Sequence, residues 1–378
     1  MTGLGVVGGI GSRDDLPVRG MANTLKSRLR CSGIISKRQV IPTNRRFYKM
    51  SFKAFRIHQQ EKGVSTGFEQ MEVDDLTEGD VVVRVAYSGI NFKDALAATG
   101  KAKILRVPDL NGGIDFSGTV ESSENARFSA GDRVLVCGCG LSETHDGGYS
   151  QVARVPAGCV VPVPESLELR DVMAIGTAGF TAAIAMIRLE ENGQSPDHGP
   201  VIVTGATGGV GSIAVDMLAG KGFEVVALTG KSDQHDYLKK LGATDFVNRH
   251  ELEMGTRPLE KGLWGGAVDN VGGETLGWLT RTVKPWGNVA SIGNASGIKL
   301  ETTVMPFILR GVSLLGINSI EMPEALRHQA WQRLADDLRP AHLDLIVPRT
   351  IEFDDLPGAF DAYLTGSVTG RTVVRIGH

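Results

Sequence analysis

The fold is decided by the stretch Val201-Ile-Val-Thr-Gly-Ala-Thr-Gly-Gly-Val-Gly211. An apolar strand runs into glycines at 205, 208 and 211, and a helical pattern follows at once over 208–220. In a loop of this kind Gly205 permits the tight turn, Gly208 lets the backbone approach a pyrophosphate, and Gly211 allows the helix to pack closely on the strand. The helix N-terminus offers free N–H groups to phosphate. The stretch therefore predicts a dinucleotide site, with a purely structural glycine turn as the alternative.

Strands and helices alternate downstream of this loop. We expect helices at 235–241 and 274–279 and strands at 201–204, 224–228, 245–247, 266–271, 287–292 and 313–317. Alternation of this kind is typical of an α/β fold with a doubly wound parallel sheet.

The sequence upstream of the loop has a different texture. From Phe52 onward short β-type runs are separated by turns, and we expect strands at 81–86, 118–121, 133–136, 152–155 and 159–163. Many short strands predict a barrel-like β domain. An Ala-rich helix follows over 171–188, interrupted around 176–179. Beyond an amphipathic helix at 323–338 the sequence is β-rich again to its end.

The residues after the second strand of the parallel sheet indicate which dinucleotide binds. NAD sites place an Asp or Glu there to accept from the ribose 2′-hydroxyl. Here the strand ends in Thr229-Gly230-Lys231, and Arg249 follows the next strand. Cations and hydroxyls at this edge favour the 2′-phosphate of NADPH, with ordinary solvated surface charge as the alternative for Lys231 and Arg249.

Composition excludes several classes of protein. The 378 residues are 42% hydrophobic and 22% charged with a net charge of −3, so a fibrous or mainly disordered chain and a general nucleic-acid binder are not expected. The sequence contains no run of 18 or more apolar residues, so we expect no transmembrane helix. Four cysteines are too few for a disulfide scaffold. The spacing of Cys137 and Cys139 does not suit zinc.

Residues 1–50 form a basic extension, with ten Lys or Arg and two acids. Three interpretations stay open: a mitochondrial-type presequence, a disordered basic tail, or a spurious start with the protein beginning at Met50. We expect a cytoplasmic protein, and a mitochondrial one only if the extension is a genuine presequence.

Five strings spread over both halves carry a resemblance to a known family: Asn91-Phe-Lys-Asp-Ala95, Gly113-Ile-Asp-Phe-Ser-Gly118, Gly176-Thr-Ala-Gly-Phe-Thr-Ala182, Arg257-Pro-Leu-Glu-Lys261 and Thr303-Val-Met-Pro-Phe-Ile-Leu-Arg310. Together with the order of the domains, they resemble the medium-chain dehydrogenase/reductase superfamily. Within it they are similar to the acrylyl-CoA reductase (NADPH) subgroup of the zinc-independent, quinone-oxidoreductase-like branch. The resemblance covers about Phe52 to Ile376.

The resemblance implies a GroES-like catalytic domain made of 51–173 and 321–378, and a Rossmann domain, 174–320, that binds NADPH. It also implies a homodimer. Zinc enzymes of the superfamily carry a Cys near the start of the site and a Gly-His-Glu motif, but this chain has Asn91 to Asp94 at the first place and Asp115-Phe116 at the second. Because a catalytic zinc needs three protein ligands, we expect no metal.

The implied reaction is reduction of the activated C=C bond of acrylyl-CoA to propanoyl-CoA, by hydride transfer from NADPH to the β carbon. Asn91, Lys93 and Asp94 are the candidate catalytic residues, although Lys93 and Asp94 can equally be a structural pair that opens a helix. The resemblance implies cofactor contacts that extend the glycine loop: Phe92, Thr207, Gly208, Gly209, Val210, Thr229, Gly230, Lys231, Arg249, Asn294, Ile308 and Ser319, besides Gly205 and Gly211.

One departure concerns Phe92, where the family often has Tyr. A Tyr hydroxyl can bond the cofactor or relay a proton, whereas Phe can only pack against the nicotinamide. Two alternatives to the acrylyl-CoA reaction therefore stay open. One is a reductase of quinones or of small enals and enones. The other is a non-catalytic NADPH-binding protein.

Overall fold

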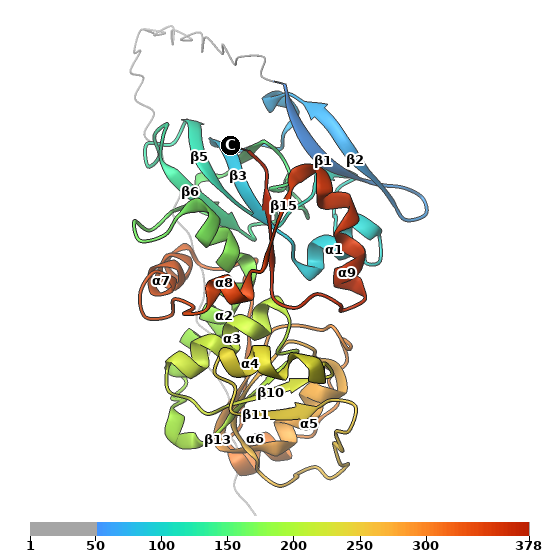
Figure 1. Ribbon diagram of the computed structural model, residues 1–378, viewed down its shortest axis with the longest axis vertical. Coiled ribbons are helices and arrows are strands. Elements are labelled where there is room, and N and C mark those ends of the chain that lie inside the picture. The colour runs from blue at the N-terminus through green and yellow to red at the C-terminus, as the bar shows by residue number, and fades with distance from the viewer. Residues whose placement is uncertain (1–50, 378) are drawn as a thin grey trace, which may run out of the picture. The chain divides into compact units, whose positions relative to one another are not determined.

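The computed structural model describes residues 51–377. The three interpretations of residues 1–50 lie outside these residues. The described chain contains a six-stranded parallel sheet, a seven-stranded sheet and a three-stranded sheet (Figure 1).

The parallel sheet has the strand order β11-β10-β9-β12-β13-β14. Its strands are β9 (Val201–Thr204), β10 (Val225–Thr229), β11 (Asp245–Asn248), β12 (Trp264–Asp269), β13 (Val283–Ser291) and β14 (Ser313–Gly316). Counted from β9, this is the order 3-2-1-4-5-6 of a dinucleotide-binding fold. The switch point lies between β9 and β12, and the glycine loop leaves β9 there.

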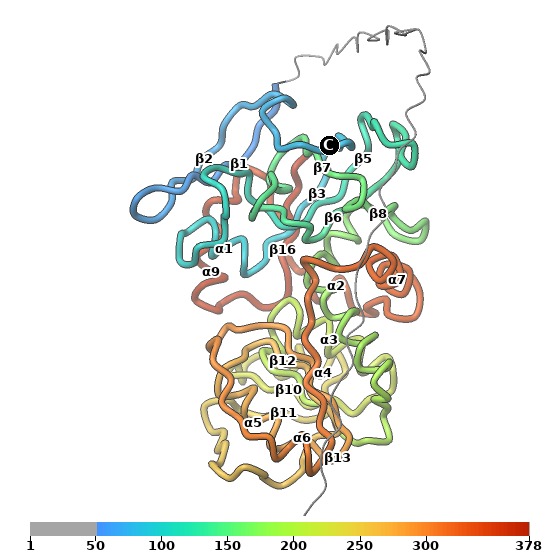
Figure 2. Tube along the Cα trace, turned by 180° about the vertical axis from the view of Figure 1, so that it is seen from behind, coloured from blue at the N-terminus to red at the C-terminus, as the bar shows by residue number. Residues whose placement is uncertain are grey.

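Helices cover both faces of this sheet, as a doubly wound fold requires. Val201 and Val203 of β9 face a core shared with α2 (Leu169–Glu191), α3 (Gly209–Gly220) and α4 (His235–Lys240). Ile202 faces the opposite core, where α5 (Gly273–Thr282) packs. Figure 2 shows these strands grouped together from the other side. The predicted α/β fold is confirmed.

The seven-stranded sheet has the order β15-β16-β3-β5-β6-β8, with β7 pairing with β3. Its bounds are β3 (Val81–Gly89), β5 (Asp115–Ser123), β6 (Arg133–Cys137), β7 (Val152–Val155), β8 (Val161–Pro162), β15 (Arg349–Glu352) and β16 (Thr372–Arg375). All its pairs are antiparallel except β15 with β16. The predicted β-rich half is therefore present, and it takes two strands from the end of the chain.

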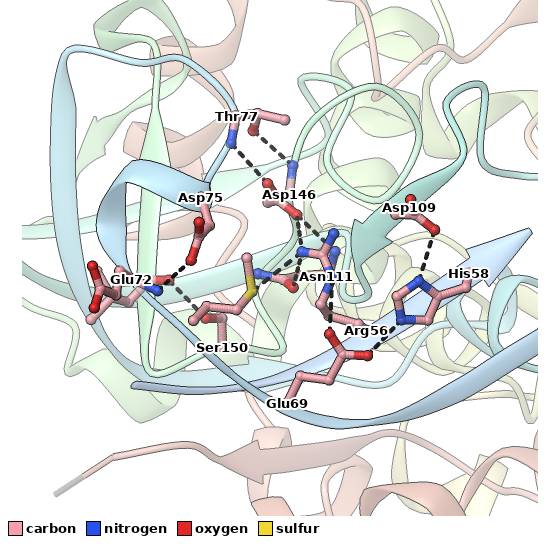
Figure 3. Close-up of polar contacts among 12 residues, drawn as sticks. Arg56, His58, Glu69, Glu72, Asp75, Thr77, Asp109, Asn111, Asp146 and Ser150 are labelled. Atoms are coloured by element: carbon pink, nitrogen blue, oxygen red, sulfur yellow. Dashed lines mark hydrogen bonds and ion pairs between the residues drawn. The ribbon is translucent and has the colours of Figure 1, made fainter. Parts of the chain in front are cut away.

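The three-stranded sheet β2-β1-β4 carries a cluster of polar contacts (Figure 3). Its strands are β1 (Phe52–Gln59), β2 (Val64–Met71) and β4 (Asp109–Asn111). His58 of β1 bonds Glu69 and Asp109 on the two flanking strands, each at 2.7 Å. Despite partial burial, which opposes it, bonding to the two carboxylates raises the pKa of His58. The imidazole of His58 therefore links β1 to both β2 and β4.

Helix α2 links the two larger sheets. It is 23 residues long, and Gly176 inside it has φ 51° and ψ −160°, so the predicted interruption is confirmed as a kink. Within the described residues it is the helix long and apolar enough to cross a membrane, but 89% of its apolar window is buried inside the fold. Phe180 of α2 stacks on Trp331 of α7 (Glu324–Leu334) with ring centroids 5.9 Å apart. Helix α2 is therefore a core helix.

The prediction of a β-rich chain end is wrong in part. The structure has α8 (Leu343–Ile346), a 3-10 helix at Phe353–Gly358 and α9 (Phe360–Leu364) beside the two strands. Glu352 and Asp355 form a capping box that starts the 3-10 helix. Phe353, Leu356 and Phe360 then insert into the core of the seven-stranded sheet. These helices are too short to show a helical repeat, so the sequence pattern hides them.

Gly211 supplies a test of the close approach between α3 and β9. A Cβ added there would lie 2.3 Å from the Gly205 carbonyl oxygen and 2.8 Å from the Ala206 Cα, both rigid backbone atoms. We expect Gly211→Ala to lower the free energy of unfolding by about 1–3 kcal/mol. Gly220→Ala on the same helix meets nothing within 4 Å and is the matched control.

The measurement is urea unfolding of the full chain and both variants. The control is expected to keep or slightly raise the wild-type stability, since Ala restricts the unfolded chain. Equal midpoints for Gly211→Ala and Gly220→Ala would contradict the packing role of Gly211.

Candidate active site

The glycine loop has the geometry expected of an anion site. Gly205 has φ +57°, and Gly208 is the N-cap of α3. The first helical hydrogen bond runs from the Ser212 N–H to the Gly208 carbonyl at 2.8 Å. The N–H groups of Gly209, Val210 and Gly211 therefore have no acceptor within the helix. Such groups at a helix N-terminus are available to phosphate oxygens.

The segment before β16 lies against this loop. The Gly370 N–H donates to the Thr207 carbonyl at 2.9 Å. A Cβ on Gly209 would lie 3.1 Å from the Arg371 Cγ. Residues near the end of the chain thus form one wall of the glycine loop, which the sequence pattern did not indicate.

The predicted 2′-phosphate residues come together at the end of β10. The Lys231 N–H donates to the Thr229 hydroxyl at 3.1 Å, and the Arg249 N–H donates to the Thr229 carbonyl at 3.1 Å. Gly230 lies beneath Arg249, because a Cβ there would be 2.6 Å from the Arg249 Nε. The structure therefore brings Thr229, Gly230, Lys231 and Arg249 into one group.

A buried polar network joins Asn91 and Asp94, at the start of α1, to Asp115 and Arg371. The Asn91 side-chain amide donates to Asp94 and Asp115, each at 3.1 Å, and its oxygen accepts from Arg371 at 3.1 Å. Asp115 also accepts from the backbone N–H of Thr177 at 2.7 Å. The Arg371 Nη2 lies 4.0 Å from the Asp115 carboxylate.

Arg371 anchors this network to the kink of α2. Its guanidinium donates to the carbonyls of Met173 and Ala174, which the kink exposes, and only 1% of the residue is accessible. A Cβ on Gly176 would lie 2.2 Å from the Arg371 Nη2. Sequence reasoning missed Arg371, and it considered Asp115 only as a position that lacks a zinc ligand.

Asp94 opens α1 (Phe92–Thr99) in a capping box with Asn91. Its carboxylate accepts from the backbone N–H groups of Asn91 at 2.8 Å and Ile114 at 3.0 Å. Burial, reinforced by Asp115, raises the pKa of Asp94 to about 7. With 1% exposure and its oxygens engaged, Asp94 has the geometry of a positioning residue.

Lys93 has a partner other than Asp94. Its ammonium forms an ion pair with Glu143, whose side chain is 9% exposed and which also faces Arg106 at 3.5 Å. Lys93 and Asp94 therefore do not bond each other, although Asp94 does open the helix as the structural alternative expected. Glu143 lies 50 residues from Lys93, so no local pattern could have found it.

The four remaining predicted cofactor residues lie in four separate places. Phe92 is the first residue of α1 and is 42% exposed. Asn294 lines a cavity of about 190 Å³ beside Gly272 and Gly273. Ser319 accepts a hydrogen bond from the Thr181 hydroxyl at 3.0 Å. Ile308 lies on α6 (Met305–Arg310) and is 68% exposed. Their roles as cofactor contacts stay predictions.

The residues present do not fit a catalytic zinc. Asp115 accepts from Gly89, Asn91 and Thr177, and Arg371 faces it, so its oxygens are already engaged by donors. Phe116 beside it has no donor atom. Residues 51–377 contain no group of three His, Cys, Asp or Glu side chains that could hold a metal.

Asp94 supplies a prediction of pH dependence. Its pKa is about 7 in the folded protein against 3.8 for a free carboxyl, so between pH 4 and 7 the folded state holds a proton that the unfolded chain has lost. The contribution of Asp94 to stability therefore falls as pH rises through this window. We expect the stability difference between wild type and Asp94→Asn to be smaller at pH 8 than at pH 5.

Denaturant unfolding of both proteins at the two pH values measures this difference. Asp74→Asn, which changes an exposed carboxylate in the 3-10 helix Val73–Asp75, is the control for a general charge effect. A difference for Asp94→Asn that is constant with pH would show that Asp94 is ionised in the folded protein at both values.

Comparison with known proteins agrees with this geometry. Residues 77–165 match the family model described as "Alcohol dehydrogenase GroES-like domain", and residues 209–336 match "Zinc-binding dehydrogenase". The chain is 46% identical to the acrylyl-CoA reductase AcuI of Ruegeria pomeroyi, over 86% of this chain and 99% of that one. It is 44% identical to "Putative quinone oxidoreductase YhfP" of Bacillus subtilis, with the same coverage.

Solved structures give the same result. The yhdH oxidoreductase of Salmonella enterica, in complex with NADP, is 44% identical with a TM-score of 0.83, over 86% of this chain and 100% of that one. The Bacillus subtilis protein yhfP, with NAD bound, also has a TM-score of 0.83 at 44% identity, over 86% of this chain and 99% of that one. The chain therefore belongs to the medium-chain dehydrogenase/reductase superfamily of oxidoreductases, in the quinone-oxidoreductase-like branch that includes the acrylyl-CoA reductases.

Proposed function

We propose that the protein is an NADPH-dependent oxidoreductase that acts on a CH–CH group and reduces acrylyl-CoA to propanoyl-CoA. The observation that carries the proposal is the 46% identity to an acrylyl-CoA reductase along nearly its whole length. The alternative is reduction of quinones or small enals and enones, which the 44% identity to a chain described as a quinone oxidoreductase supports.

The cofactor proposal rests on the end of β10. Lys231 and Arg249 lie there and no acid occupies the tip of the strand, which suits a 2′-phosphate. The relative solved with NADP has the same fold at 44% identity. Since another relative was solved with NAD, the selectivity of this chain between the two cofactors is a quantity to measure.

When bound, NADPH supplies a hydride to the β carbon of the enoyl thioester, and a proton then reaches the α carbon. The glycine loop would hold the pyrophosphate through N–H groups of α3. Phe92, exposed at the start of α1, would pack on the nicotinamide. Lys93 is the cation next to it and would stabilise the charge that develops on the thioester oxygen, with Glu143 fixing its position. Asn91 and Asp94 would hold this turn in place.

The organisation of the protein completes the proposal. We assign the GroES-like domain to 51–173 with 321–378 and the Rossmann domain to 174–320, since the seven-stranded and parallel sheets draw their strands from these ranges. The bacterial relatives fit a cytoplasmic enzyme, and they give the mitochondrial alternative no support.

A homodimer is part of the proposal, and a patch near α6 supports it. Trp286, Val304, Ile308 and Leu309 are each at least 59% exposed, and Trp286 packs over Gly311 at the end of α6. Trp286 lies within β13, and α6 comes just before β14, the edge strand of the parallel sheet. A sheet edge beside exposed apolar side chains is typical of an interface.

The substrate is tested by NADPH oxidation with acrylyl-CoA, crotonyl-CoA and a simple quinone in parallel, using protein that begins at Met50. We expect kcat/KM for acrylyl-CoA to exceed that for the quinone by at least about 10-fold, because binding of the CoA moiety contributes to the transition state. Activity on the quinone alone would move the assignment to quinone reduction. NADPH binding without turnover would indicate a binding protein.

Phe92→Tyr is the matched variant for the same assay. If the ring only packs on the cofactor, the variant keeps kcat/KM within a few-fold, and Phe92→Ala lowers it. A large gain in Phe92→Tyr would show that a hydroxyl at this position takes part in proton transfer.

The dimer is tested by sedimentation velocity. We expect wild type to be a dimer and Leu309→Glu to be a monomer, since a buried unpaired charge opposes association. Thr66→Glu adds the same charge on β2 and is expected to remain a dimer. A wild-type monomer, or a dimer in both variants, would contradict this interface.

A further inference from the structure

Cations from three separate parts of the chain gather beside the end of β10. Lys231 follows β10, Arg249 follows β11, and Arg349 is the first residue of β15 in the other sheet. The Lys231 ammonium donates to the Val368 carbonyl at 2.9 Å and lies 3.4 Å from the Thr369 hydroxyl. The Arg349 guanidinium donates to the Thr369 carbonyl at 3.1 Å. Lys231 and Arg349 therefore both bond the segment 368–369.

Arg249 also lies near Lys231, close enough to act on its charge. Its Nε would lie 2.6 Å from a Cβ on Gly230, so the guanidinium lies over the residue that precedes Lys231. His250 lies beside Arg249, and its Nε2 would also be 2.6 Å from a Cβ on Gly230. Basic side chains therefore gather around the end of β10.

The charge of this group is not balanced by the protein. Among residues 51–377 no carboxylate lies within 4.0 Å of the charged nitrogens of Lys231, Arg249 or Arg349. Burial lowers the pKa of Lys231, Asp233 opposes this, and both Arg349 and Arg249 lower it further. Asp233 accepts a bond from Gln234 at 2.7 Å. Three cations and one nearby acid leave a surplus that suits a phosphate dianion.

We propose that Arg349 is a third cation of the subsite for the 2′-phosphate of NADPH, so a residue of the seven-stranded sheet helps to select the cofactor bound by the parallel sheet. The inference rests on the proposed use of NADPH and adds a residue to Lys231 and Arg249. Arginine suits this position because its planar fork can bind two phosphate oxygens at once.

A purely structural role is the competing explanation. Arg349 also donates to the Thr372 hydroxyl at 3.2 Å, so it anchors the turn between α9 and β16. If Arg349 is only structural, its substitution weakens the binding of every adenine nucleotide equally. If it contacts the 2′-phosphate, its substitution weakens the binding of only those nucleotides that carry a 2′-phosphate. The two roles therefore differ in their ligand dependence.

The test compares binding of 2′,5′-ADP and 5′-AMP to the full chain by calorimetry at low ionic strength. We expect Arg349→Gln, which keeps a side-chain donor but loses the charge, to weaken 2′,5′-ADP by about 10-fold or more and to leave 5′-AMP unchanged. Arg349→Lys is expected to recover part of the loss. Arg375→Ala, on the neighbouring strand and paired with Glu352, is the matched control and is expected to match wild type.

The outcomes separate this inference from the proposed function. If wild type does not prefer 2′,5′-ADP to 5′-AMP, the use of NADPH fails. If wild type shows the preference and Arg349→Gln keeps it, or weakens both nucleotides equally, only the role of Arg349 fails. A raised KM for NADPH with kcat retained in Arg349→Gln, beside an unchanged melting temperature, would support the inference through turnover as well.

Discussion

The bonds of the Arg371 guanidinium are the interaction on which the site depends. This side chain is almost fully buried and connects β16 to the carbonyls of α2 at its kink and to Asn91 at the start of α1. Its charge is offset by Asp115 and by carbonyl dipoles, which keeps a buried cation tolerable. Removing either charged partner would leave the other buried without compensation. Arg371 thus fixes the relative positions of the kink at Gly176, the turn at Asn91 and the wall of the glycine loop.

The parts of the fold that the sequence predicted are those with local patterns. The strand, glycine turn and helix from Val201 to Gly220 lie where expected, because a buried parallel strand and a helix with small residues at its start are both legible within 20 residues. The position of Thr229 to Lys231 at the end of a strand was predicted for the same reason. The helix kink was also legible, since Gly176 permits a backbone conformation that other residues rarely adopt.

The parts that were missed depend on residues far apart in the sequence. Asn91, Asp115 and Arg371 form one network, but no periodicity connects position 91 with position 371. Glu143 and Arg349 are ordinary charged residues until the fold places them beside Lys93 and Lys231. The short helices near the end of the chain escaped notice because each spans at most six residues.

The place of β16 has a consequence for how the protein is made. This strand lies inside the seven-stranded sheet, between β15 and β3, and Val373 pairs with Gly89. The parallel sheet, in contrast, draws all its strands from 201–316 and can assemble while the rest of the chain is still being synthesised. Residues 87–89 of β3, which pair with β16, stay without this partner until residues 373–375 have been synthesised. Contacts so distant in sequence form slowly, so the exposed edge of β3 is the point at which nascent chains are open to aggregation or to chaperones.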